Sequence, residues 1–158
     1  MPHAIAINIF LHSLIISGIM SLGIVLLGPR FSIAHTNWFG FFAMYLLTLI
    51  FFSTAYVLIS FTIPFKRFME DFWPLIGSPM MSSGSIFFTW KKLYAFSPAL
   101  GSVTLLNPIT FVVEGLRAAL LGGTDYLQLW LCMVVIMAWI AGMFWVLSLS
   151  LGKTLDPV

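Results

Sequence analysis

Residues 126–152 read YLQLWLCMVVIMAWIAGMFWVLSLSLG, a run of 27 side chains without a charge, and Lys153 follows directly. A membrane-spanning helix needs about 20 consecutive apolar residues, so this run is long enough to cross the hydrocarbon core. Its aromatic start with Tyr126 is typical of the zone where a membrane meets water. We therefore predict a transmembrane helix over residues 126–151.

The composition of the whole chain indicates an integral membrane protein. Of its 158 residues, 61% are hydrophobic and 8% are charged, whereas soluble domains have about 45–50% and about 25%. The mean hydropathy is +1.07. The net charge of +2 is too small to indicate a nucleic-acid-binding surface. We expect a multi-pass protein of a cell membrane and no nucleic-acid partner.

Three further charge-free runs predict membrane spans at residues 5–27, 38–64 and 72–90. The third run contains Pro74 and Pro79, which a span tolerates when neighbouring helices satisfy the freed carbonyl groups. Together with the last run, they predict an all-α membrane protein with four transmembrane helices. We expect residues 1–158 to form a single transmembrane domain.

Residues 93–123 are apolar but interrupted. Asn107 is a favourable N-cap, Pro108 a favourable first helical residue, and Gly122 a favourable stop. The helix between them would be about 21 Å long, which is too short for a hydrocarbon core of about 30 Å. Two short helices near residues 97–105 and 108–121 fit better than one span. We predict a re-entrant helical hairpin over about 97–121, before the last span.

Glu114 and Arg117 lie within this segment and are three residues apart, so they share one helix face and can neutralise each other. We consider two roles for the pair. It locks the hairpin against the spans, or it gates a translocation path, and the two roles can coexist. If the two side chains act mainly on each other, exchanging Glu114 and Arg117 should partly restore what reversing Arg117 alone removes.

A second charged cluster, formed by Lys66, Arg67, Glu70 and Asp71, separates the predicted second and third spans. Its two opposite-charge pairs are four residues apart and would stabilise an exposed helical turn by a few tenths of a kcal/mol. We interpret the cluster as a membrane exit.

The sequence predicts no catalytic, cofactor-binding or metal site. Gly152-Lys153-Thr154 resembles the end of a phosphate-binding loop, but that loop needs a glycine where this chain has Leu147. The three histidines have no companions at metal-ligand spacing, and no serine or cysteine nucleophile has a base and an acid beside it. We do not expect an enzyme, and any ATP hydrolysis would belong to a partner chain.

The stretch over residues 68–123 resembles the C-terminal half of an ABC-2 type transporter permease, the membrane subunit of many bacterial ABC exporters. Three features carry the resemblance: the Asn-Pro element at residues 106–110, Glu-x-x-Arg at residues 114–117, and a helix rich in small residues that ends at Gly123. Residues 79–88 resemble the penultimate span of that family. The pattern extends over about residues 5–151.

The resemblance implies the last four spans of a six-span fold in the bacterial inner membrane, with both termini cytoplasmic and the hairpin on the outer side. It also implies an ATP-binding cassette subunit and a second permease subunit as partners, in a homo- or heterodimer. In that topology the cluster of Lys66, Arg67, Glu70 and Asp71 would be cytoplasmic, which makes it a candidate surface for the ATPase subunit. The chain would then form a path for an amphiphilic substrate such as a glycan-lipid, a drug or a lipid, driven by ATP hydrolysis on the partner.

Two alternatives to this function remain. Because the first two spans of the family pattern are missing, the chain can be a truncated or split membrane subunit that does not transport by itself. It can also be a small autonomous channel, although the four predicted spans contain no acidic or basic side chain to line a pore.

Overall fold

The computed structural model describes residues 36–63, 65–83, 85–122 and 125–155. All of these residues except Thr36 belong to one compact unit, Asn37–Val158. The predicted span at residues 5–27 lies outside the described residues. Within the described ranges the chain forms helices and short connections and contains no strand, so the predicted all-α class is confirmed there.

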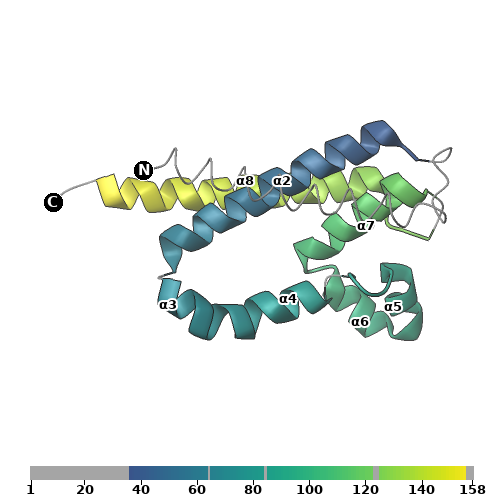
Figure 1. Cartoon of the computed structure of the whole chain (residues 1–158), viewed down its shortest axis with the longest axis horizontal. Coiled ribbons are helices and arrows are strands. Elements are labelled where there is room, and N and C mark those ends of the chain that lie inside the picture. The colour runs from purple at the N-terminus through teal and green to yellow at the C-terminus, as the bar shows by residue number, and fades with distance from the viewer. Residues whose placement is uncertain (1–35, 64, 84, 123–124, 156–158) are drawn as a thin grey trace, which may run out of the picture. The chain divides into compact units, whose positions relative to one another are not determined.

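The helices follow one another along the chain as labelled in Figure 1. Their bounds are α2 Trp38–Thr62, α3 Phe65–Arg67, η3 Phe68–Gly77, α4 Ser78–Ser83, α5 Trp90–Phe96, α6 Pro98–Thr104, α7 Pro108–Leu121 and α8 Leu129–Leu155.

Two of these helices, α2 and α8, are long and apolar enough to cross a membrane. They match the predicted spans at residues 38–64 and 126–151. The Asn37 side chain caps the first turn of α2 by accepting a hydrogen bond from the Gly40 N–H at 2.9 Å. The Thr48 and Thr54 hydroxyls donate to carbonyl groups one turn earlier, each at 2.8 Å. No hydroxyl of these two threonines is therefore left unpaired within an apolar helix.

Helix α7 packs against both long helices and completes a three-helix core. The buried members of this core are Met44 and Phe51 from α2, Phe111 and Val112 from α7, and Cys132, Ile136 and Met143 from α8. Gly115 lies where the three helices meet. A β-carbon added there would lie 2.8 Å from the Met44 Cε atom and 2.9 Å from the Cys132 Cβ atom, so the close approach of α7 depends on glycine.

The predicted third span at residues 72–90 is not one uniform helix. Residues 65–83 are helical throughout, but Phe68–Gly77 form a π-helix in which the Ser78 N–H bonds to the Trp73 carbonyl group. Pro74 lies inside this π-helix and has no N–H for the regular ladder, which accounts for the wider register. The chain then bends from Ser85 to Phe88. The count of four spans stays a prediction.

The segment over residues 97–121, which was predicted to form two short helices, does contain two short helices. The first helix, α6, begins after Ser97, whose hydroxyl accepts a hydrogen bond from the Leu100 N–H. The second, α7, has the predicted Asn107 cap and Pro108 start, and it ends at Gly122 with a φ of 62°. The two axes differ by 95°, so the pair is either one broken span or a re-entrant loop. The described residues therefore contain two to three candidate membrane-spanning elements.

Replacing Gly115 by alanine should destabilise the protein, because the rigid Cys132 β-carbon cannot move away from the added methyl group. We expect a loss of about 1–3 kcal/mol in the free energy of unfolding, measured by denaturation of the purified chain in mixed micelles. Gly142→Ala is the matched control, since nothing lies within 4 Å of a β-carbon there. Equal losses in both variants would contradict the packing described for α7.

Candidate functional site

Glu114 is the one buried charged residue in the described part of the chain. It lies on α7, and its side chain has 0% solvent exposure. One carboxylate oxygen, Oε1, accepts a hydrogen bond from the Trp90 N–H at 3.0 Å, and Oε2 accepts one from the Leu127 N–H at 3.2 Å. Trp90 begins α5, and Leu127 lies two residues before α8. A single carboxylate therefore connects α7 to the starts of two other helices.

Arg117 lies one turn further along α7 and forms an ion pair with Glu114, with 3.5 Å between Nη1 and Oε1. Its guanidinium group also donates to the carbonyl groups of Ser85 and Ile86, and to that of Phe88 at 3.5 Å. The Arg117 side chain is 24% exposed, so one edge of it remains near the surface. The predicted pairing of Glu114 with Arg117 is present, but most hydrogen bonds of both side chains go to backbone groups.

The loop that Arg117 holds is itself unusual. Ser85 has a φ of 56°, and it is the one described residue other than glycine with a positive φ. Such a backbone conformation costs roughly 1–2 kcal/mol for a residue with a side chain. Ser85 is 2% exposed, and its hydroxyl has no hydrogen-bond partner among the described residues. The guanidinium group therefore stabilises a loop conformation that the local sequence disfavours.

Asn107 has two functions in the structure, of which the sequence predicted one. Its Oδ1 atom accepts from the Ile109 N–H at 3.0 Å, which is the expected N-cap of α7. Its Nδ2 atom donates to the Met80 carbonyl group and to the Ser83 hydroxyl, the latter at 3.2 Å. Asn107 therefore also ties α4 to α7. Pro108 follows it as the buried first residue of α7 and leaves no helical N–H unpaired at that position.

Sequence reasoning missed the link between α5 and α6. The Trp90 indole N–H donates to the Gly101 carbonyl group at 2.9 Å, and the Thr104 hydroxyl donates to the same oxygen at 2.9 Å. The Thr110 hydroxyl then donates to the Thr104 carbonyl group at 2.7 Å. A sequence signal existed for Gly101, a glycine inside a short helix, because that often marks a close approach of backbones.

The charged cluster at Lys66, Arg67, Glu70 and Asp71 lies on α3 and the start of η3, and all four residues are exposed. The predicted pairs at four-residue spacing do not form ion pairs among these described residues. None of the four is a partner of Glu114 or Arg117, so the two charged clusters are separate.

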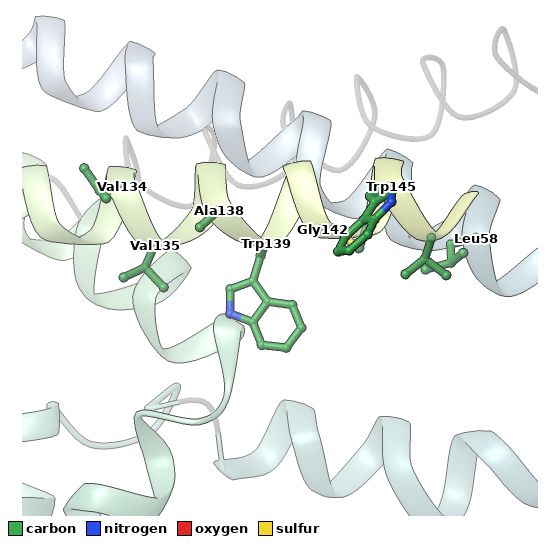
Figure 2. Close-up of a pocket in the computed structure, with 9 residues that line it drawn as sticks. Leu58, Val134, Val135, Ala138, Trp139, Gly142 and Trp145 are labelled. Carbon is green, nitrogen blue, oxygen red and sulfur yellow. The ribbon is translucent and has the colours of Figure 1, made fainter. Parts of the chain in front are cut away.

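An apolar groove of about 630 Å³ runs along α8, with Leu58 of α2 at one end. Figure 2 shows Trp139 and Trp145 extending from α8 on either side of Gly142. The remaining lining residues are Val134, Val135, Ala138, Met143 and Val146. An apolar molecule could pack against these side chains, but they include no acid or base.

The Glu114–Arg117 cluster, meaning these two side chains and their backbone partners, can hold three helices and a loop in one arrangement. Among the described residues, no three His, Cys, Asp or Glu side chains come together as a metal site would require. Comparison of the chain with models of protein families, with curated proteins and with solved structures finds no match.

Replacing Glu114 by glutamine should destabilise the protein strongly. An amide NH₂ cannot accept a hydrogen bond, so one of the two backbone N–H groups would lose its partner and Arg117 would lose its counter-charge. We expect a loss of about 2–4 kcal/mol in the free energy of unfolding, measured in mixed micelles. The same change at exposed Glu70 should alter stability by at most about 0.5 kcal/mol. Similar effects at both positions would show that Glu114 is not the buried anchor described here.

The structure also changes the outcome that we expect for exchanging the two charges. In the double variant Glu114→Arg/Arg117→Glu, an arginine cannot accept from the Trp90 and Leu127 N–H groups, and a carboxylate cannot donate to the Ser85 and Ile86 carbonyl groups. We now expect the double variant to be no more stable than Arg117→Glu alone. A double-mutant cycle on stability tests this, and a rescue above about 1 kcal/mol would restore the simpler picture of direct pairing.

Proposed function

We propose that this chain is a permease subunit of an ABC-2 type exporter. In this proposal residues 5–27 and 72–90 are the first and third of four spans, and the α6–α7 pair enters and leaves the membrane on the same side. Two permease subunits would form the path for an amphiphilic substrate, and ATP hydrolysis would take place on partner chains. The described residues offer binding and positioning groups for this role.

One observation carries the proposal: a pair of apolar helices bent by 95° lies between two helices that are long enough to span. Broken backbone at membrane depth is tolerated where protein covers it and satisfies its polar groups. Eight of the 14 residues of α7 are buried, including Gly115. The polar groups freed at the breaks have partners, since Glu114 and Asn107 accept from N–H groups and Arg117 donates to carbonyl groups.

The Glu114–Arg117 cluster suits a part that moves as a rigid body. Its hydrogen bonds join α7 to the starts of α5 and α8 and to the loop at Ser85, so these elements shift together or the bonds break. An exporter needs two alternative packings whose energies ATP binding on a partner can change. Because the hydrogen bonds of the cluster are either formed or broken, the two packings would be distinct states. In this proposal the cluster locks the hairpin and transmits movement as well.

Topology gives the first test. Single cysteines in place of Lys92 and Asp125 should react with a membrane-impermeant maleimide from the same side of the membrane, because a re-entrant pair returns the chain to the side that it left. The buried Cys132 serves as the unreactive background. Labelling from opposite sides would mean that α6 and α7 form one broken span, and the re-entrant hairpin would be wrong.

Assembly gives the second test. We expect the tagged chain, extracted from its native membrane, to co-purify with an ATP-binding cassette protein and with vanadate-sensitive ATPase activity. Arg117→Glu should lower that activity at equal amounts of folded chain, while Asp125→Asn, at an exposed charge outside both charged clusters, should leave it unchanged. Recovery of a companion membrane subunit without an ATPase would favour the split, non-transporting alternative. Ion flux through vesicles that contain this chain alone would favour the channel.

A further inference from the structure

Helices α5 and α6 form a tight pair whose inner face is filled. The Trp90 indole bonds to the Gly101 carbonyl group at 2.9 Å, and the Trp90 and Tyr94 rings lie 5.2 Å apart between centroids. A β-carbon on Gly101 would come within 2.7 Å of the Tyr94 Cα atom, so the two backbones are almost in contact. The Ser97 hydroxyl caps the start of α6. The outer side chains of this pair therefore extend from two helices that are held firmly together.

These outer side chains are large, apolar and exposed. Phe96, at the end of α5, is 83% exposed, and Val103 on α6 is 62% exposed. Other exposed apolar side chains of the same segment are Phe87, Phe88, Leu100 and Leu106. Several large apolar side chains exposed within one segment that also carries charged residues indicate contact with a membrane or with another protein.

The charge of this segment favours contact with a membrane over contact with another protein. Residues 85–122 contain three basic residues and one acidic residue, and the acidic one is the buried Glu114 that pairs with Arg117. Lys91 and Lys92 are exposed in the first turn of α5. The segment therefore has a net charge of +2, which equals the net charge of the whole chain, because the charges elsewhere cancel. Two lysines beside exposed Phe and Leu side chains are complementary to the phosphate groups and acyl chains of a lipid surface.

We propose that the α5–α6 pair is a binding site for anionic phospholipid headgroups at the membrane–water boundary. Lys91 and Lys92 bind the phosphate groups, while Phe96, Leu100 and Val103 enter the acyl layer. This inference requires that the chain resides in a membrane, but it does not depend on the exporter assignment.

The spacing on α5 fits the boundary. Phe96 follows Lys92 by four residues, so the aromatic ring and the ammonium group lie on the same side of the helix. Interfacial helices bury their apolar side about 5–10 Å below the headgroups. Lysine stems add reach, because they run along apolar surface and keep the ammonium group at the water side. The charged turn at Lys66 and Arg67 differs, since exposed Glu70 and Asp71 follow it at once and cancel its charge.

The full chain with Phe96→Cys, labelled with bimane and reconstituted in phosphatidylcholine vesicles, tests the proposal. Phosphatidylglycerol with brominated acyl chains is titrated into the vesicles, and brominated phosphatidylcholine is titrated in a parallel series. We expect bimane to be quenched by both lipids, and by phosphatidylglycerol at much lower mole fractions. Lys91→Gln/Lys92→Gln should weaken the apparent affinity for phosphatidylglycerol by roughly 10- to 30-fold, at about five-fold for each lysine.

The controls separate this site from general attraction to an anionic surface. Lys66→Gln/Arg67→Gln should keep the preference for phosphatidylglycerol, and Lys91→Arg/Lys92→Arg should also keep it. Equal quenching by the two lipids in the parent chain would overturn the proposal, as would an equal loss in both glutamine variants. Loss of the preference on adding inorganic phosphate, but not chloride at the same ionic strength, would assign the site to a soluble anion instead. Each result is obtained without an ATPase and therefore leaves the exporter proposal to its own tests.

Discussion

Backbone hydrogen bonding in an apolar setting is the constraint on which the rest of the described structure depends. An unpaired N–H or carbonyl group in hydrocarbon costs several kcal/mol, and every break in a helix creates such groups. This chain breaks its helices repeatedly between Ser83 and Leu129. At these breaks Arg117 donates to carbonyl groups, while Glu114 and Asn107 accept from N–H groups. The positions of Asn107, Glu114 and Arg117 therefore match the backbone groups that they satisfy.

Much of the fold could be predicted from the sequence, because the decisive signals are local. An apolar run longer than a membrane span predicts α2 and α8, and the Asn107-Pro108 start and Gly122 stop predict α7 to the residue. The π-helix could not be predicted in this way. Pro74 and Pro79 indicate a disturbed helix, but the alternatives of a kink, a break and a wider register differ little in local energy. Helix α5 was also missed, because its first N–H is held by Glu114, 24 residues away.

The sequence predicted which two charged residues form the candidate site but not how the site is arranged, because only the first depends on local signals. A spacing of three residues on a helix identifies Glu114 and Arg117 as neighbours, and the structure has them 3.5 Å apart. Their partners at Ser85, Trp90 and Leu127 are separated from them by 10 residues or more along the chain. Such contacts depend on how α5, α7 and α8 pack, which no local pattern encodes. Ser85, with its positive φ, lies in the loop whose carbonyl groups accept from Arg117.

The hydrogen bonds of Glu114 and Arg117 affect how the helices that they join can move. A lone ion pair in an apolar interior gains little over a well-packed apolar pair, so attraction between Glu114 and Arg117 is a poor reason for their presence. Their bonds to backbone groups are a better one, because apolar side chains could not replace them. Movement of α7 against α5 or α8 must break hydrogen bonds of the Glu114 carboxylate, which is fully buried. The free-energy cost of keeping this carboxylate buried rises steeply once it loses a hydrogen-bond partner. Elements joined in this way do not deform gradually, and a transition between two packings would involve the whole cluster at once.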